Sequence, residues 1–228
     1  MTAPCVGGGD YLAQRVDLDA MIPREDFAIA EEVSGTELIR DFPISYLASD
    51  SPYLRLLRKP DFQRETNHWS PEQVVAFIES FVDNEVIPSV ILWKSPKYLF
   101  VIDGGHRLSA LRAWMEDDYG DGALSTAFQK GEGGRKAREK IAKRTRFLIG
   151  QRVGGYTKLK GYVGLKDITE PEASRAHTLF TRALTLQWVL GNADRAETSF
   201  FKINSQGTPL DETEELLIKN RRKPFAVG

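Results

Sequence analysis

The sequence of 228 residues is poor in cysteine and histidine and has no long apolar run. Its one cysteine, Cys5, excludes a disulfide framework and a cysteine-based zinc site within a single chain. His68 and His177 lack the spacing of metal ligands, and no Walker phosphate loop or ordered Ser-His-Asp set is present. No apolar run approaches the roughly 18 residues of a membrane span, and the N-terminus shows no signal-peptide pattern. We therefore expect a cytoplasmic protein with no membrane contact.

Charge is segregated along the chain, although the formal net charge is only -1. Acids outnumber bases between Asp10 and Asp50, whereas residues 130–160 carry many bases and only the acids Glu132 and Glu139. Such asymmetry indicates an anionic partner, and DNA attracts cations by counterion release whatever its sequence. A solvated basic helix is the competing interpretation. The candidate DNA-binding residues are Arg135, Lys136, Arg138, Lys140, Lys143, Arg144 and Arg146.

The chain divides into a lead, an acidic segment and one domain. Residues 1–9 are rich in glycine, and we predict that they are disordered. Residues 10–41 form the acidic segment, and 42–228 are expected to form a mixed α/β or α+β domain with a basic insertion at about 129–160.

Local signals predict most of the elements of this domain. Ser70 followed by Pro71 is typical of a helix start, and the apolar face of this helix ends near Asn84. Pro43 restricts the strand that contains it to an edge or a strand start. The predicted strands are 42–47, 88–93, 98–102 and 184–190, of which 88–93 and 98–102 form a hairpin. The further helices are one after the glycines at 104–105, then 135–146, 172–180, 193–203 and one from Thr208.

The most informative turn reads Asp103-Gly104-Gly105-His106-Arg107 and joins a predicted strand to a helix. Glycines allow backbone N–H groups to approach an anion, and a helix start offers unpaired donors. Histidine and arginine oppose the helix dipole there, so a bound anion would relieve the repulsion. We expect Arg107 to bind phosphate oxygens, His106 to donate to them or to handle a proton, and Asp103 to hold Mg²⁺ or orient water. A plain connection with Asp103 as the helix cap is the competing interpretation.

Two further segments carry candidate ligand-binding residues. Gln63 and Arg64 precede the helix that begins after Ser70, and the functional interpretation places them in the same cleft as the glycine turn. Lys202 and Asn204, near the last predicted helix, are expected to close over the ligand. A solvated loop and a pair of helix caps are the competing interpretations.

These motifs, in this order, resemble the N-terminal domain of the GmrSD-type modification-dependent restriction proteins, a branch of the ParB/sulfiredoxin-like superfamily. The family pattern is F-Q-R before a Trp and a helix, I-P-x-I, D-G-Q-Q-R, and F-x-x-I-N-x-G-G-x-P-L. The matching segments are 62–64 with Trp69, 87–90, 103–107 and 200–210. The resemblance therefore runs from about residue 42 to 220, and it implies an α+β fold with a small mixed sheet surrounded by helices.

The resemblance implies that the central turn binds and helps to hydrolyse a nucleoside triphosphate, coupled to the cleavage of modified phage DNA. Gly105 and His106 replace the usual pair of glutamines. Since the family's His-Asn-His nuclease domain is absent from the sequence, we expect a separate nuclease domain or subunit as partner. The residues that inherit a site role are Gln63, Arg64, Asp103, Gly104, Gly105, His106, Arg107 and Asn204.

Two alternatives stay open beside nucleotide hydrolysis. The first is a non-enzymatic DNA-binding or modification-sensing module, like the related domain of phosphorothioate-sensing restriction proteins, in which the turn grips a DNA phosphate. The second is a ParB-like nuclease. Sulfinic acid reduction is rejected, because Gly105 stands where sulfiredoxin has its catalytic cysteine and Cys5 is remote in the sequence.

Overall fold

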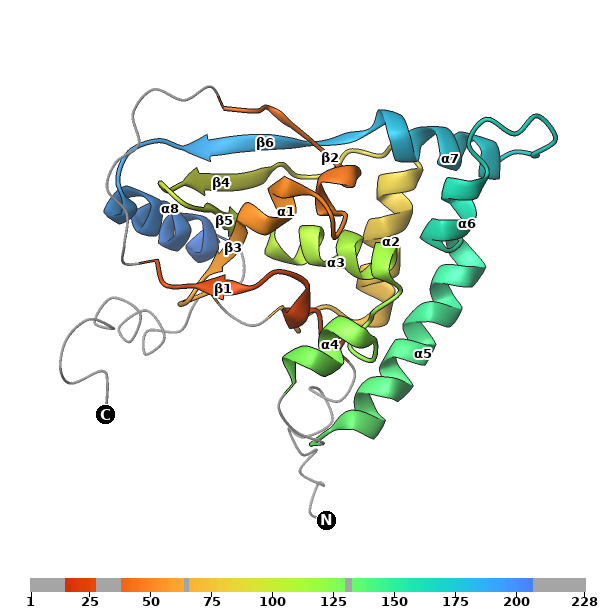
Figure 1. The fold of residues 1–228 in the computed structure, drawn as a ribbon, viewed down its shortest axis with the longest axis horizontal. Helices are drawn as coiled ribbons and strands as arrows, with labels where there is room; N and C mark the ends of the chain where they lie inside the picture. Colours follow the sequence, from red (N-terminus) through yellow and green to blue (C-terminus); the bar gives the residue numbers. More distant parts are fainter. Residues whose placement is uncertain (1–14, 28–37, 64–65, 130–132, 207–228) are drawn as a thin grey trace, which may run out of the picture.

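The computed structural model describes residues 15–27, 38–63, 66–129 and 133–206. Within these residues the chain is an α+β protein, with six strands in one mixed sheet and helices around it (Figure 1). The predicted α+β class is confirmed, while the likeness to ParB and sulfiredoxin stays a prediction. The predicted disordered lead lies outside the described residues. The strands are β1 (Arg24–Glu25), β2 (Asp41–Pro43), β3 (Leu57–Pro60), β4 (Val90–Lys94), β5 (Leu99–Asp103) and β6 (Ala183–Val189).

The helices have a range of lengths and surround the sheet. None of those in the described residues is long and apolar enough to cross a membrane. The helices are α1 (Pro52–Leu56), α2 (Pro71–Val82), α3 (Gly105–Glu116), α4 (Ala123–Phe128), α5 (Arg135–Arg152), α6 (Tyr156–Gly161), α7 (Glu172–Thr181) and α8 (Ala193–Gln206).

The sheet has the order β1-β3-β5-β4-β6-β2. β5 lies parallel to β3 and antiparallel to β4, and the predicted hairpin of β4 and β5 is confirmed. β6 lies parallel to β4, and β2 pairs antiparallel with β6 at one edge. Pro43 therefore sits on an edge strand, where its missing N–H leaves no ladder bond unmade.

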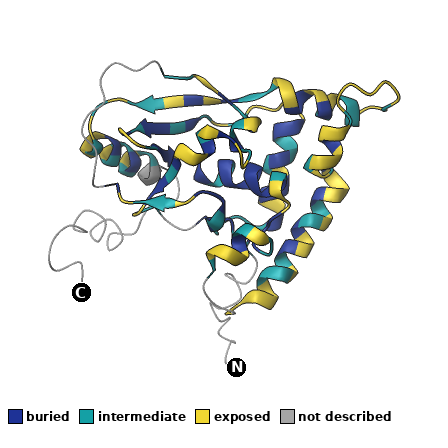
Figure 2. Ribbon diagram, viewed as in Figure 1, coloured by how far each residue is buried: buried dark blue, intermediate teal, exposed yellow. Residues whose placement is uncertain are grey.

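The central strands are buried on both faces. Leu99 and Val101 of β5 belong to the core under α2 and α3, whereas Phe100 and Ile102 belong to an aromatic cluster under α8. This alternation follows the two-residue period of a strand, and it explains the unbroken apolar run in the sequence. Figure 2 shows the buried residues gathered in the central strands and in α2 and α3. β5 thus ends, at the glycine turn, between two packed layers.

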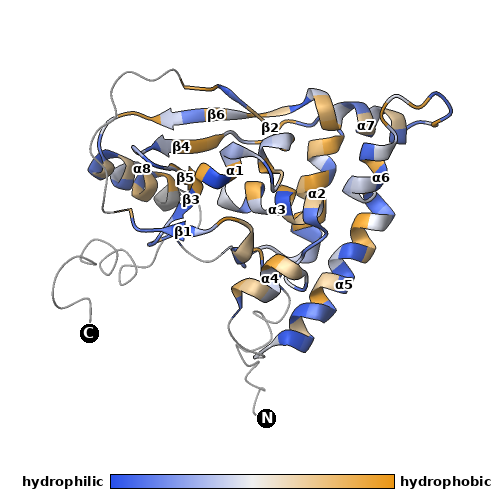
Figure 3. Cartoon of the chain, viewed as in Figure 1, coloured by the Kyte–Doolittle hydropathy of each residue, from blue (hydrophilic) through white to orange (hydrophobic). Residues whose placement is uncertain are grey.

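α2 forms as predicted and supports a second layer of helix. The Ser70 hydroxyl accepts a hydrogen bond from the Gln73 N–H, and the Gln73 side chain accepts one from the Ser70 N–H, which completes a capping box. α5 lies along the outer side of α2 and buries only Ala142, Thr145 and Ile149 (Figure 1). Along α5, hydrophilic stretches alternate with apolar ones, as Figure 3 shows.

Two expectations about local structure were wrong or incomplete. The predicted strand 42–47 ends at Pro43, and Ile44–Leu47 forms a 3-10 helix instead. Ile44 and Leu47 are both buried, and a spacing of three suits one turn of helix rather than a strand. β3 was not predicted, because Arg58 and Lys59 are not typical of a buried strand. The helix predicted from Thr208 lies outside the described residues.

β3 is held by a buried ion pair. The Lys59 ammonium, fully excluded from solvent, donates to Asp19 Oδ1 at 2.6 Å, to the Asp19 carbonyl at 2.9 Å and to Thr66 Oγ1 at 3.0 Å. Arg24 Nη2 and the Thr66 N–H also donate to this carboxylate, at 2.9 and 3.1 Å. Three stretches of chain, 15–27, β3 and the loop that leads to α2, therefore meet at one carboxylate.

Burial and pairing oppose each other at this ion pair. Burial is the largest influence on the Asp19 carboxyl and raises its pKa, but hydrogen bonds from Arg24, Lys59 and Thr66 together hold the pKa below its usual value. Burial lowers the pKa of Lys59, and the charge of Asp19 acts against that shift. Each charge is therefore tolerated in the interior only because the other is present.

We expect Asp19→Ala to lower the free energy of unfolding by about 3–5 kcal/mol, because it leaves the Lys59 ammonium buried without a counter-charge. Denaturant titration followed by circular dichroism measures this change. Asp41→Ala, at an exposed position of β2, is the control and should change stability by no more than about 0.5 kcal/mol. Equal stability of the two variants would show that Asp19 does not hold β3.

Candidate functional site

The turn between β5 and α3 requires glycine at position 104. Gly104 is the N-cap of α3 and has φ of 96°, in the left-handed region. A Cβ atom there would lie 2.9 Å from Val90 Cγ2 on the neighbouring strand. Because the N-cap is Gly104, and no side chain donates or accepts a capping hydrogen bond there, the interpretation of Asp103 as an ordinary helix cap is wrong. The glycine lets the chain turn sharply against β4.

The first turn of α3 leaves backbone donors available. The first hydrogen bond of this helix runs from the Leu108 N–H to the Gly104 carbonyl at 3.0 Å. The N–H groups of Gly105, His106 and Arg107 therefore have no carbonyl partner within the helix. They point along the helix axis at its positive end, an arrangement that suits an anion.

Arg107 is held at the mouth of this turn by two neighbours. Its Nη2 atom donates to Asp103 Oδ2 at 2.5 Å and to the Ser89 carbonyl at 3.0 Å. The Arg107 side chain is only 14% exposed, whereas the Asp103 side chain is 38% exposed. Arg107 Nε is buried and has no hydrogen-bond partner among the described residues. The guanidinium is thus fixed in direction while part of its donor capacity stays unused.

Gln63 lies directly over Gly105. A Cβ atom on Gly105 would be 3.5 Å from Gln63 Nε2 and 3.6 Å from Gln63 Oε1. Gln63 Oε1 is buried, and within the described part of the chain it accepts no hydrogen bond. The Gln63 N–H donates to the Pro60 carbonyl at 3.0 Å, which continues β3 into this loop. The structure therefore brings together Gln63 and the glycine turn, as the sequence led us to expect.

His106 points into a cluster of rings beside the same turn. Its ring centroid lies 5.5 Å from that of Trp69, with 26° between the planes, and 5.7 Å from that of His68. Its Nε2 atom is buried and finds no hydrogen-bond partner in the residues that the structure describes. Burial lowers the pKa of His106 to about 4, and the electrostatic influence of His68, Lys59 and Arg107 adds to this shift, although Asp103 acts in the opposite direction. The imidazole is therefore neutral at pH 7.

Sequence reasoning missed the ring cluster and the buried lysine. His68 stands 38 residues before His106 and had been set aside for lack of ligand spacing, since nothing local shows that the two rings meet. Trp69 was only a landmark of the family pattern. Lys59 carried no signal at all, because its partner Asp19 lies 40 residues away.

The third motif approaches the site through its aromatic residues. Phe200 of α8 packs its ring 5.0 Å from that of Phe62, the residue before Gln63. Lys202 is exposed on α8, and the roles of Lys202 and Asn204 stay predictions. The side chain of Asn204, like the whole of Arg64, lies outside what the structure describes.

The described residues contain no group of three or more His, Cys, Asp and Glu side chains that could hold a metal ion. Asp103 can offer one partly exposed carboxylate. One carboxylate fits Mg²⁺, which binds to proteins through one or two carboxylates and takes its other ligands from phosphates and water. The Mg²⁺ expectation is therefore compatible with this turn only if a phosphate ligand is present.

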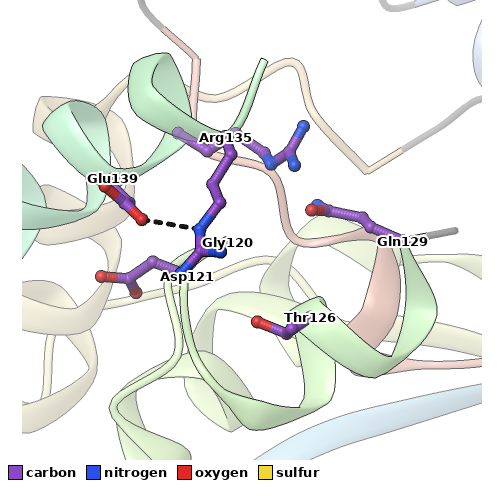
Figure 4. Close-up of a pocket in the computed structure, with 7 residues that line it drawn as sticks. Gly120, Asp121, Thr126, Gln129, Arg135 and Glu139 are labelled. Carbon is purple, nitrogen blue, oxygen red and sulfur yellow. Dashed lines mark hydrogen bonds and ion pairs between the residues drawn. The ribbon is translucent and has the colours of Figure 1, made fainter. Parts of the chain in front are cut away.

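A hollow of about 280 Å³ lies elsewhere, between the α4 region and the start of α5. Most of its charged groups are paired: Arg135 with Glu139 at 2.9 Å (Figure 4), and Asp121 with Arg146 at 3.0 Å. Arg138 Nη1 donates to the Gly133 carbonyl at 2.7 Å, whereas its buried Nε has no hydrogen-bond partner among the described residues. Gln129 also donates to Asp17 at 2.8 Å. Because the glycine turn combines a helix start with atoms of Gln63, His106 and Arg107 that lack a hydrogen-bond partner in the described chain, we place the candidate site there and not in this hollow.

The low pKa of His106 predicts a pH dependence of stability. In the unfolded chain the His106 imidazole has a pKa of 6.5, whereas in the folded chain it becomes protonated only near pH 4. The contribution of the neutral His106 to the free energy of unfolding should therefore be fully present above pH 6.5. Up to about 3 kcal/mol should be lost as the pH falls towards 4. NMR titration of the imidazole and denaturation at several pH values measure both effects. In His106→Gln this part of the pH dependence should vanish; an imidazole that titrates near 6.5 would contradict the expectation.

Comparison with known proteins gives one finding for the family. No curated protein and no solved structure matches the chain significantly. A family model, however, matches residues 48–222, about three quarters of the chain, and it describes the N-terminal domain of the GmrSD restriction endonuclease. The match includes Gln63, the glycine turn and α8, the elements that form the candidate site. The chain belongs to the family of GmrSD restriction endonuclease N-terminal domains, and is thus a domain of a restriction system.

Proposed function

We propose that this domain binds a nucleoside triphosphate at the turn Asp103–Arg107 and hydrolyses it, in a restriction system that acts on modified DNA. One observation carries the proposal: Gln63 Oε1, His106 Nε2 and Arg107 Nε are all buried without hydrogen-bond partners in the described part of the chain. An unpaired buried polar atom destabilises a protein by about 1–3 kcal/mol. A ligand with several acceptors and donors would satisfy these atoms.

The residues of the turn divide the work of binding a terminal phosphate. The N–H groups at the start of α3 would donate to its oxygens, and the unused donors of Arg107 would bind a further oxygen. Asp103 holds Arg107 in direction and can contribute one ligand to a phosphate-bound Mg²⁺, which would neutralise charge during the transfer. Catalysis would then consist mainly of positioning and electrostatic stabilisation while water displaces the diphosphate from the γ-phosphorus.

The departure from the family pattern changes which side chains can bind the ligand in this proposal. In this chain the Gln63 amide lies beside the position that a Cβ atom on residue 105 would take. Gln63, which the family pattern also contains, would be the amide group that remains at this turn. The neutral imidazole of His106 would replace the second amide as a hydrogen-bonding group of no charge.

Thermal shift with GTP or ATP in Mg²⁺ tests binding. A nucleotide at 100 times its Kd stabilises the folded state by about 2.7 kcal/mol, which corresponds to about 5–10 °C in a chain of this size. Release of inorganic phosphate tests hydrolysis. Asp103→Ala and Arg107→Ala should abolish release without unfolding the chain, because they remove the polar groups nearest the transferred phosphate.

Gly105→Ala separates binding from folding. The new methyl group would make ordinary contact with Gln63 at 3.5 Å, so the fold should persist, but it would press on the Gln63 amide that lies over Gly105 in this chain and should weaken nucleotide binding several-fold. Gly161→Ala is the matched control, since nothing lies within 4 Å of the added Cβ atom. His106→Gln should retain binding and His106→Ala should lose it.

The same measurements discriminate between the alternatives. Wild-type phosphate release in both Asp103→Ala and Arg107→Ala would refute the catalytic role of the turn. A melting temperature that rises with DNA alone, in a steeply salt-dependent way, would favour the DNA-sensing module instead. Cleavage of a plasmid in Mg²⁺ or Mn²⁺ by the chain itself would favour the nuclease.

A further inference from the structure

The outward side of α5 carries one continuous row of side chains. Lys136, Lys140, Lys143 and Phe147 follow one another at spacings of four, three and four residues, so they share the face opposite the buried Ala142, Thr145 and Ile149. All four are exposed, and Phe147 keeps 65% of its surface in solvent. We call these four residues the outer row of α5.

The arginines of the same helix are used differently. Arg144 donates to Glu72 at 3.0 Å, and Arg146 to Asp117 and Asp121 at 2.8 and 3.0 Å. Arg152 pairs with Glu79 of α2. These ion pairs fasten α5 to α2 and to the loop that follows α3. They account for much of the basic charge that the sequence offered as a DNA contact.

The three lysines of the outer row have no such partners. No carboxylate of the described residues forms an ion pair with Lys136, Lys140 or Lys143, and the row itself contains no acid. The only acid of α5, Glu139, is paired with Arg135 on the helix flank. The row is therefore a stretch of uncompensated positive charge that ends in an exposed aromatic ring.

We propose that the outer row of α5 docks on the backbone of double-stranded DNA, with the lysines at phosphates and Phe147 against a sugar or base edge. The proposal rests on the restriction-system role but not on nucleotide hydrolysis. The first and last of these lysines lie seven positions apart, roughly 10 Å along the helix, and a duplex presents about six negative charges over that length. An acidic protein surface would need an apolar centre, and the row provides a single large apolar side chain.

The position of α5 keeps this surface apart from the glycine turn. α5 packs on α2, which separates it from the sheet and from the end of β5 (Figure 1). DNA along the outer row would therefore leave the start of α3 accessible. The two sites are independently testable.

Fluorescence anisotropy with a 30-base-pair duplex, from about 50 to 200 mM salt, tests the proposal with the full chain. Lys136→Gln/Lys140→Gln/Lys143→Gln should raise Kd at least tenfold and lower the slope of log K against log salt by about 2–3, because each phosphate contact contributes about 0.9. Phe147→Ala should raise Kd several-fold and leave the slope unchanged. Lys94→Gln/Lys97→Gln/Lys166→Gln removes the same charge elsewhere, and its Kd should stay within twofold of wild type.

Equal losses in the two triple variants would overturn the proposal, because binding would then follow net charge alone. So would wild-type affinity in the outer-row variant, or poly-glutamate that competes as well as an equal charge of DNA. The nucleotide-induced rise in melting temperature should be the same in the outer-row variant and in wild type. If wild type binds DNA through the row but shows no nucleotide effect, the proposed nucleotide site fails and the DNA surface stands.

Discussion

The fold depends on one buried ammonium group, that of Lys59, and on the hydrogen-bond acceptors that surround it. Lys59 sits in a strand with no access to water, and a charge in that position is stable only with an opposite charge and hydrogen bonds around it. Asp19 and Thr66 provide them. In doing so they join the stretch 15–27 to β3 and fix the loop that carries Gln63, His68 and Trp69. The geometry of the candidate site is thus set by an interaction outside it.

The same charge reaches the candidate site electrostatically. The Lys59 ammonium is one of the positive groups that keep the proton off His106, with burial as the larger cause. A histidine without charge beside a triphosphate would act by hydrogen bonding, and the cationic role falls to Arg107 and the helix start. In this turn hydrogen bonding and positive charge would therefore come from different groups, whereas a charged histidine would have supplied both.

Locally encoded structure could be predicted from the sequence, and structure encoded by distant partners could not. Ser70 with Pro71, and the apolar runs of β4 and β5, carry their own signals, so α2, the hairpin and the start of α3 were expected. The meeting of Gln63 with Gly105 followed from family order rather than from spacing. β3 escaped prediction because its stability comes from Asp19, and the ring cluster escaped because His68 and His106 are far apart in the chain.

The family match begins at residue 48, yet both outer strands of the sheet come from earlier residues. β1 covers the side of β3, and β2 covers the side of β6. A fragment cut at the start of the match would expose two rows of unpaired backbone donors and acceptors, each ready to pair with another molecule. It would also bury Lys59 without Asp19. β1, β2 and Asp19 therefore belong to the same folded unit as the matched residues, and a fragment made of this domain has to include them to keep both edges of the sheet covered and Lys59 paired.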